Sequence, residues 1–411
     1  MLLTSFVFLL FFLVVFLLHY GLFCKNRNAQ NAFIFIVSCV FYSWWDWRFL
    51  LLLLITSLST YSAGIWMEKY EEQLSLRKWV HVTCIMLNIG ILLGFKYFNF
   101  FVETFVDLFK TFGLNLSIHP LHIILPVGIS FYTFSALSYS IDVYQKKVKP
   151  THDLLAYLSY VTFFPAILSG PINRAGKQLP QFFQCRYFDY SNVVEGSKSL
   201  VWGIFVKLCV ADRLGIYVDT VYANMIQHTG ITLLFTSVVY SLQIYADFAG
   251  YSWMAFGLGK MLGIDLQTNF IRPYFAGTVT DFWRRWHISL TTWFRDYIYF
   301  PLGGNRCSRQ RWMINTMIVF VVSGLWHGAA YTFLLWGALH GICMILEKVI
   351  YGDRLKTMCP QFSVVHLLRM GSTFAIINVL WILFRIDSVR SFQYIGSQLY
   401  DSLMGGVILC L

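Results

Sequence analysis

The chain is short of charged side chains. Only 12% of its 411 residues are Asp, Glu, Lys or Arg, whereas soluble domains average about 25%. Its mean hydropathy is +0.61, and apolar runs long enough to cross roughly 30 Å of hydrocarbon recur along its length. The alternating segments of about ten residues that build a transmembrane barrel are absent. These features exclude a soluble globular protein and predict an all-α polytopic membrane protein.

Several chemical signatures are also missing. The nine cysteines are scattered, with no CxxC pair and no cluster of His and Cys, so we predict neither a disulfide framework nor a metal site. No GxxxxGKS/T loop, GxSxG elbow or HExxH motif occurs. The net charge of +11 does not indicate nucleic acid, because the basic residues lie in short loops between apolar runs. We therefore expect no bound cofactor and no nucleic-acid partner.

The apolar segments predict a helical bundle of about 11 transmembrane helices, within one membrane domain that covers 1–411. The segments are 3–23, 31–44, 48–66, 79–98, 121–143, 154–170, 198–221, 231–248, 312–327, 331–350, 366–384 and 399–411. Several are shorter than the roughly 20 residues that a span needs, so we expect some to be re-entrant or buried within the bundle.

The distribution of charge predicts the orientation of the chain. Residues 1–18 lack the positive n-region of a cleavable signal peptide, and no small-residue cleavage site follows them. The first charges, Lys25 and Arg27, come after the first apolar segment. By the positive-inside rule the N-terminus is outside, and the basic loops at 69–78 and 146–149 are cytoplasmic. A transporter or channel fits these observations as well as an enzyme does.

The stretch DFWRRWHISLTTWFRDYIY at 281–299 places three arginines among three tryptophans. At about 100° per residue, one sector of a helical wheel of 282–298 is almost wholly apolar. That sector contains Phe282, Trp283, Trp286, Leu290, Trp293, Phe294, Tyr297 and Ile298, and the opposite half contains Arg284, Arg285, Ser289, Thr291, Thr292, Arg295 and Asp296. We predict one amphipathic helix lying along the cytoplasmic membrane surface.

His287 falls inside the apolar sector of this helix, beside Trp283 and Phe294. A helix that only anchors the chain to the membrane gains nothing by turning a histidine toward the core. Two interpretations remain open on the pattern alone. His287 is either a core histidine whose ring nitrogens bond to backbone carbonyls, or part of a functional site.

A second histidine-bearing stretch, SGLWHGAAYTFLLWGALHG at 323–341, lies within an apolar segment that runs from 312 to 350. As one helix this segment would be about 58 Å long, roughly twice the thickness of the bilayer core. It must therefore break, and the glycines and alanines near His327 favour that position. The small-xxx-small pairs Gly324/Gly328 and Gly337/Gly341 permit close contact between helices.

His327 is therefore expected at a helix break. It is either a histidine that bridges two helices by a hydrogen bond or a general base, since imidazole titrates near neutral pH. An ionisable side chain at membrane depth is a functional candidate by default. His340 follows 13 residues later. It either supports His327 or packs separately, and we expect a structural role for it.

Two further polar sites interrupt apolar segments. Gln243 and Asp247 are four residues apart and share one face of a predicted helix. Because a carboxylate at a helix centre costs about 2.5–3.5 kcal/mol on insertion, Asp247 should face a partner inside the bundle, such as Arg284 or Arg285. A structural ion pair and a catalytic carboxylate both remain open.

In FFPAILSGPINRAGK (163–177), two prolines flank Gly170, so this segment cannot form a regular helix and is predicted to be broken or re-entrant. Asn173 and Arg174 follow the second proline. They are candidates for contact with a phosphate-bearing ligand, or for a positive-inside anchor of the chain.

Five stretches together resemble the membrane-bound O-acyltransferase family, in its bacterial alginate O-acetyltransferase branch. They are ILPVGISFYTFSALSYSIDVY (124–144), SYVTFFPAILSGPINR (159–174), YSLQIYADFAGYSWMAFGLG (240–259), TDFWRRWHISLTTWFRDYIYFPLGGNR (280–306) and SGLWHGAAYTFLLWGALHG (323–341). They occur in the family's order within 120–385, whereas the N-terminal third matches only as a hydrophobic pattern.

The resemblance implies transfer of an acyl group, usually acetyl, from a cytoplasmic thioester toward an exported polysaccharide. The family's characteristic histidine lies in the WHG motif, here His327 with Trp326 beside it, and is expected to be the general base. A second lies in the FWRRWH motif, here His287, and is expected to orient the donor or stabilise an oxyanion. Arg174, Arg284 and Arg285 are expected to steer an anionic donor, although a solvated positive-inside face explains them equally well.

The resemblance also implies partners and a location. The expected donor is acetyl-CoA or another acyl carrier, and the protein is expected in the cell's inner membrane. Because the donor is inside and the glycan outside, either the acceptor reaches a tunnel through the bundle or a periplasmic acyltransferase takes over the acyl group. D-alanyl transfer from a carrier protein, a non-catalytic transporter and a membrane scaffold are the alternatives.

Two features depart from the alginate branch. Trp253 stands after GYS, where that branch commonly has an aspartate, so no role for an acid carries over to this position. The sequence also ends soon after its WILFR segment (381–385), whereas members of the branch usually continue with further helices.

Overall fold

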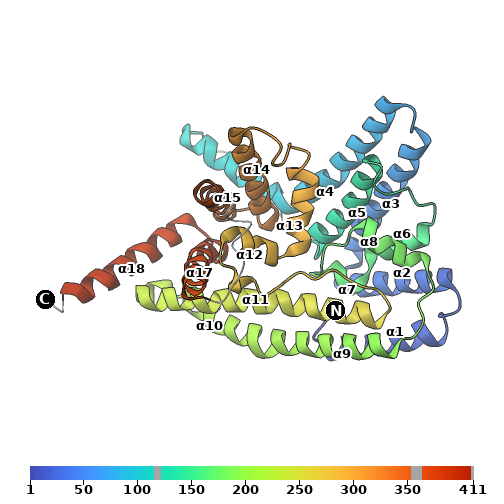
Figure 1. Ribbon diagram of the computed structural model, residues 1–411, viewed down its shortest axis with the longest axis horizontal. Helices are drawn as coiled ribbons and strands as arrows, with labels where there is room; N and C mark the ends of the chain where they lie inside the picture. Colours follow the sequence, from blue (N-terminus) through green and yellow to red (C-terminus); the bar gives the residue numbers. More distant parts are fainter. Residues whose placement is uncertain (115–120, 122, 353–362, 409–411) are drawn as a thin grey trace. The chain divides into compact units, whose positions relative to one another are not determined.

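The computed structural model describes residues 1–114, 121, 123–352 and 363–408 of the chain (Figure 1). In this described part, every regular element is a helix. The all-α prediction is therefore confirmed. The segments predicted at 121–143 and 399–411 include residue 122 and residues 409–411, which lie outside the described residues.

The chain divides into two compact units, and each is described by itself. Unit 1 comprises Met1–Ile204 and Tyr251–Thr268, and unit 2 comprises Phe205–Gly250 and Asn269–Leu411. The helices that begin in unit 1 are α1 (Phe6–Gly21), α2 (Arg27–Ser43), α3 (Trp47–Lys69), α4 (Leu74–Thr111), α5 (Ile129–Tyr144), α6 (Leu154–Thr162), α7 (Phe164–Ile167), α8 (Ala175–Gln178), η1 (Leu179–Phe183) and α9 (Tyr190–Phe205).

Unit 2 holds the remaining helices, of which α11 continues into the second segment of unit 1. They are η2 (Val206–Ala211), α10 (Asp212–Ala223), η3 (Met225–Gln227), α11 (Gly230–Met261), η4 (Pro273–Phe275), α12 (Val279–Arg285), α13 (Ile288–Phe294), η5 (Arg295–Tyr299), α14 (Arg309–His327), α15 (Tyr331–Tyr351), α17 (Val364–Arg385) and α18 (Val389–Ile408). The elements η2 and η5 are π-helical.

Among the described residues, five helices are long and apolar enough to cross a membrane, by length and composition. They are α3, α4, α11, α15 and α17. With the apolar composition of the chain, they make it a multi-pass membrane protein. Several predicted boundaries are wrong. Helix α4 extends well beyond 79–98, and α11 continues past residue 248 to Met261. Helix α5 begins at Ile129 and not at 121, α6 ends at Thr162 within the segment 154–170, α9 begins at Tyr190 and not at 198, and α18 begins at Val389 and not at 399. In α11 the largely apolar sequence after residue 248 sustains the helix, and its glycines do not end it.

The broken segment predicted at 163–177 is confirmed in unit 1. Helix α6 ends at Thr162, and Pro165 occupies the first turn of the short α7, where its missing N–H leaves no bond unmade. Gly170 packs against α7 so closely that a Cβ there would lie 2.5 Å from the Cα of Ala166. The chain then passes Pro171 and enters α8, so the segment is a sequence of turns and not a spanning helix.

The break predicted near His327 is also confirmed. In unit 2, α14 ends at His327 and α15 begins at Tyr331, and the two helices pack side by side as an antiparallel pair (Figure 1). A Cβ on Gly324 would lie 2.2 Å from the carbonyl oxygen of Phe333, and one on Gly337 would lie 2.3 Å from that of Phe320. The small residues therefore set the distance between the two helices.

Candidate functional site

The segment 282–298 is not one helix, so that prediction is wrong. Helix α12 ends at Arg285, Trp286 is extended, and His287 adopts a left-handed conformation with φ 42° and ψ 54° before α13 begins. A helical wheel assumes continuous rotation and does not detect a break that contains neither glycine nor proline. The pattern failed here because contacts from elsewhere in unit 2 hold the backbone in this shape.

The burial predicted for the apolar side is largely confirmed. Six of its residues are less than 7% exposed, namely Phe282, Trp283, Trp286, Leu290, Trp293 and Phe294. Ser289 is also fully buried, although the wheel placed it on the polar side. The break at His287 explains this difference, because it changes the rotation of α13 relative to α12.

His287 lies in an apolar, aromatic environment. Its side chain is 1% exposed, and its ring centroid is 4.6 Å from that of Phe248 on α11 and 6.0 Å from that of Trp326 on α14. The residue is outside the five long apolar helices. Burial lowers the pKa of the His287 imidazole well below its ordinary value, and the charge of His327 acts in the same direction. His287 is therefore a neutral imidazole at pH 7.

His327 is the last residue of α14 and is partly exposed. Its ring centroid is 4.9 Å from Trp326, 5.1 Å from Trp336 and 5.1 Å from Phe384 on α17. Trp326 therefore contacts the rings of both His287 and His327. The two histidines, 40 residues apart in the sequence, belong to one aromatic cluster within unit 2.

His340 belongs to the same cluster but is fully enclosed. It is 0% exposed, and its Nδ1 accepts a hydrogen bond of 3.3 Å from the indole N–H of Trp283. Its ring also packs on Trp336, with centroids 4.8 Å apart. These contacts let His340 hold Trp283 and Trp336 in place, and Trp336 also packs on the ring of His327.

Asp247 pairs with Lys207, so the partners predicted for it, Arg284 and Arg285, are wrong. Its carboxylate lies 2.5 Å from the ammonium of Lys207, whereas Arg285 pairs with Asp281 at 2.9 Å. Lys207 is in the π-helix η2 and also lies 2.6 Å from Asp212. A lysine 40 residues upstream gives no local signal in the sequence.

Gln243 lies one turn before Asp247 on α11, and Gly215 of α10 faces its side-chain amide. The Lys207 side chain is 18% exposed and that of Asp247 is 37% exposed. The described part of unit 2 therefore contains a partly buried ionic group next to Phe248, which contacts His287.

Replacing Lys207 by methionine is expected to destabilise the protein by about 1–3 kcal/mol, because Asp247 loses its ionic partner in an apolar bundle. Adding Asp247→Asn should recover part of this loss, since the unpaired charge is then removed. The thermal unfolding midpoint of the detergent-purified variants measures both effects. A double variant less stable than Lys207→Met alone would contradict the pairing.

The remaining candidates are divided between the two units. In unit 1, Asn173 is buried and its carbonyl accepts a hydrogen bond of 3.0 Å from the Tyr160 hydroxyl, while Arg174 precedes α8. In unit 2, the side chain of Arg284 is exposed and that of Arg285 is partly buried in its ion pair with Asp281.

Two polar residues near the break at His287 were not predicted from the sequence. Asn269, which is 2% exposed, bonds to the first turn of α13. The carboxylate of Glu347 on α15 accepts hydrogen bonds from the backbone N–H groups of Val279 (2.7 Å) and Thr280 (2.8 Å) at the start of α12. Glu347 could have been found, because it is a charged residue at the end of an apolar segment; no pattern marks Asn269.

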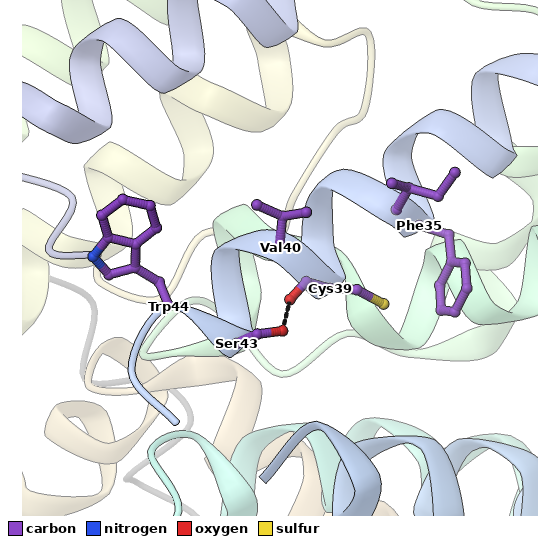
Figure 2. A pocket seen from close by; sticks show the side chains of 6 residues that line it. Phe35, Cys39, Val40, Ser43 and Trp44 are labelled. Atoms are coloured by element: carbon purple, nitrogen blue, oxygen red, sulfur yellow. Dashed lines mark hydrogen bonds between the residues drawn. The ribbon is translucent and has the colours of Figure 1, made fainter. Parts of the chain in front are cut away.

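Two surface grooves lie on unit 1, away from these residues in the sequence. Figure 2 shows the first, on α2, where Phe35, Cys39, Val40, Ser43 and Trp44 line a shallow apolar surface and the Ser43 hydroxyl donates to the carbonyl of Cys39. The second is formed by residues 93–105 of α4 and is equally apolar. Their apolar linings suit contact with lipid.

The comparisons with known proteins agree with the resemblance noted in the sequence. The family described as MBOAT, membrane-bound O-acyltransferase, matches residues 36–386, which span both units. The chain is 36% identical over 404 residues to a probable alginate O-acetylase of Pseudomonas aeruginosa, covering 98% of this chain and 75% of that protein.

Two further relatives have names that give other acceptors. A peptidoglycan O-acetyltransferase of Helicobacter pylori is 31% identical over 416 residues, covering 94% of this chain and 76% of that protein. A teichoic acid D-alanyltransferase of Bacillus subtilis is 28% identical over 239 residues, covering 55% of this chain and 60% of that protein. All three names describe attachment of an acyl group, acetyl in two of them and D-alanyl in the third.

Proposed function

The chain belongs to the membrane-bound O-acyltransferase family and is a multi-pass membrane O-acyltransferase, and we propose that it transfers an acetyl group from a cytoplasmic thioester to hydroxyl groups of an exported or cell-surface polysaccharide. The observation that carries the proposal is the placement of His287, Trp326 and His327 in one aromatic cluster. The relatives named as O-acetyl transferases, which cover 94–98% of the chain, support acetyl as the group transferred.

His327 suits the role of general base. It is the last residue of α14, so no further helical turn follows it directly. Its side chain is partly exposed, whereas His287 and His340 are buried. A neutral imidazole nitrogen of His327 accepts the proton of an acceptor hydroxyl as that oxygen attacks the thioester carbonyl carbon. The new C–O bond forms, the C–S bond breaks, and the imidazolium returns its proton to the departing thiolate. The products are an ester and a free thiol.

His287 suits a different role because it is neutral and enclosed. A neutral imidazole carries one N–H, which can donate a hydrogen bond to the carbonyl oxygen as negative charge develops on it. The apolar surroundings of Phe248 and Trp326 strengthen such an interaction, since water does not compete for it. His340 and Trp326 fix the rings around the two histidines, and Gln243 and Asp247 offer polar contacts for the acceptor.

The donor proposed is acetyl-CoA, approaching from the cytoplasm. Within unit 2, Arg284 and Arg285 supply positive charge for its phosphates, and the exposed side chain of Arg284 is available for such contact. Arg174 of unit 1 stays a separate prediction for contact with a phosphate-bearing ligand. The protein lies in the inner membrane with its N-terminus outside, in keeping with the positive-inside rule. The acceptor glycan is outside, so the acetyl group either reaches it through the bundle or passes to a periplasmic acyltransferase partner.

The second candidate function is D-alanyl transfer from a carrier protein, which the similarity to the teichoic acid D-alanyltransferases favours over 55–56% of the chain. In a host that lacks the gene for such a carrier, the exported polysaccharide should keep its full ester content, and mass spectrometry should identify the ester as acetyl. Loss of the ester in that host, or a D-alanyl group detected on the glycan, would contradict acetyl-CoA as the donor and would favour a carrier-bound D-alanyl donor.

A further inference from the structure

The backbone at His287 needs an external support. With φ 42° and ψ 54° the residue is left-handed, a conformation that few non-glycine residues adopt and that persists only where neighbouring contacts hold it. His287 is also the residue that precedes α13, where a Ser, Thr, Asn or Asp side chain usually caps the first N–H groups. The His287 side chain makes no such capping bond, since its ring packs on Phe248 and Trp326 instead.

Asn269 supplies the missing cap from a separate segment of unit 2. Its backbone carbonyl accepts a hydrogen bond of 2.9 Å from the N–H of Ile288, and its side-chain Oδ1 accepts one of 3.3 Å from the N–H of Ser289. These are two of the N–H groups that have no partner within α13 itself. The side chain of Asn269 is 2% exposed, so water does not replace it in this role.

The same segment also holds the other side of the break. The N–H of Ile271 donates a hydrogen bond of 3.0 Å to the carbonyl of Arg285, the last residue of α12. Between Asn269 and Ile271, the ring of Phe270 packs 5.0 Å from that of Trp286 and 5.1 Å from that of Phe248. Residues 269–271 therefore bond to the chain both before and after His287.

We propose that Asn269 is a positioning residue for acyl transfer: it caps α13 in place of His287 and so fixes the orientation of the imidazole relative to the reacting thioester. The inference rests on the proposed role of His287. Without the Oδ1 acceptor, the first turn of α13 loses one bond and the left-handed turn can relax. The imidazole then moves while the donor-binding surface stays unchanged. The chemical step therefore becomes slower, and the affinity for the donor stays the same.

The test is a double-variant cycle of Asn269→Ala and His287→Ala. Membranes with matched amounts of each variant receive labelled acetyl-CoA, and the rate of base-labile ester formation is measured against donor concentration. Asn269→Ala should lower kcat by about 10- to 100-fold and leave KM nearly unchanged, since small displacements of a catalytic group have effects of this size. In the His287→Ala background, the same change should have an effect of less than about twofold, because both act through one group.

Conservative variants separate positioning from folding. Asn269→Asp keeps an acceptor oxygen at the same place and should restore most of the rate. Asn269→Gln keeps the amide but moves the acceptor oxygen, so it should slow the reaction as Asn269→Ala does. If the Asn269→Ala protein does not accumulate in the membrane, Asn269→Gln takes its place in the cycle. Asn315 is a matched control, because it is fully buried in unit 2 and bonds to the carbonyl of Leu302. Asn315→Ala should alter the rate by the same factor in both backgrounds.

Equal effects of Asn269→Ala with and without His287, or a wild-type rate for Asn269→Gln, would overturn the positioning role alone. A wild-type rate for His287→Ala would instead overturn the role proposed for His287, and the positioning role with it.

Discussion

Replacing His327 by alanine is expected to lower O-acetylation of the exported polysaccharide by at least about 100-fold, at an unchanged amount of protein in the membrane. General-base catalysis by a positioned side chain contributes about 10²–10⁴ in rate, and His327 is the partly exposed histidine of the cluster. The alanine variant keeps the close packing of α14 on α15, because the contacts of Gly324 and Gly337 do not involve the imidazole. The ester content of the polysaccharide, measured after mild base release, reports the loss.

The control for this variant is His152→Ala. His152 is exposed and pairs with Glu68 at 2.8 Å in unit 1, so its removal tests the loss of a histidine outside the aromatic cluster. It should leave acetylation within about twofold of wild type, as expected for a surface ion pair of small energetic value. Full acetylation by the His327→Ala variant would contradict the assignment of His327 as the general base.

Replacing Gly324 by alanine is expected to destabilise the protein by about 1–3 kcal/mol and to reduce acyl transfer as well. A Cβ at this position would lie 2.2 Å from the carbonyl oxygen of Phe333, which belongs to the backbone and cannot rotate away. Helices α14 and α15 must therefore separate. His327 is three residues further along α14, so the separation displaces the proposed base together with Trp326.

Gly371 on α17 provides the matched control, since a Cβ there meets nothing within 4 Å. Gly371→Ala should be neutral or stabilise the protein by about 0.4–1 kcal/mol, because alanine has the lower entropy in the unfolded chain. The thermal unfolding midpoint of the purified variants checks both changes. If Gly324→Ala were as stable and as active as Gly371→Ala, then close packing of α14 on α15 would not determine the geometry of the site.

Features that depend on residues close in sequence were predictable. The break at His327 followed from the small residues near it together with a length argument, since one helix of 39 residues would be about 58 Å long. Length alone does not decide it, because α4 is one helix of 38 residues. The broken segment around Pro165 and Pro171 followed from the missing N–H groups of proline. The family resemblance then identified the chemistry, and the family match excludes the view that the protein is a transporter without catalytic activity.

Features that depend on distant residues were not predictable. The turn at His287 is held by Asn269, which is 18 residues earlier and carries no recognisable pattern. The partner of Asp247 is Lys207 on another helix, and the arginines that seemed suitable by charge are exposed or paired elsewhere. Periodicity describes one helix at a time, whereas these contacts arise only when several helices pack together.

The central claim is that His327 carries out acyl transfer from a thioester. Its most direct test supplies labelled acetyl-CoA to the cytoplasmic face of inverted membrane vesicles that also contain the acceptor glycan. Vesicles with the wild-type protein should form a labelled, base-labile ester and release an equal amount of free thiol, and vesicles with His327→Ala should form less than about 1% of that ester. Ester formation by the His327→Ala vesicles at half the wild-type rate or more would contradict the account.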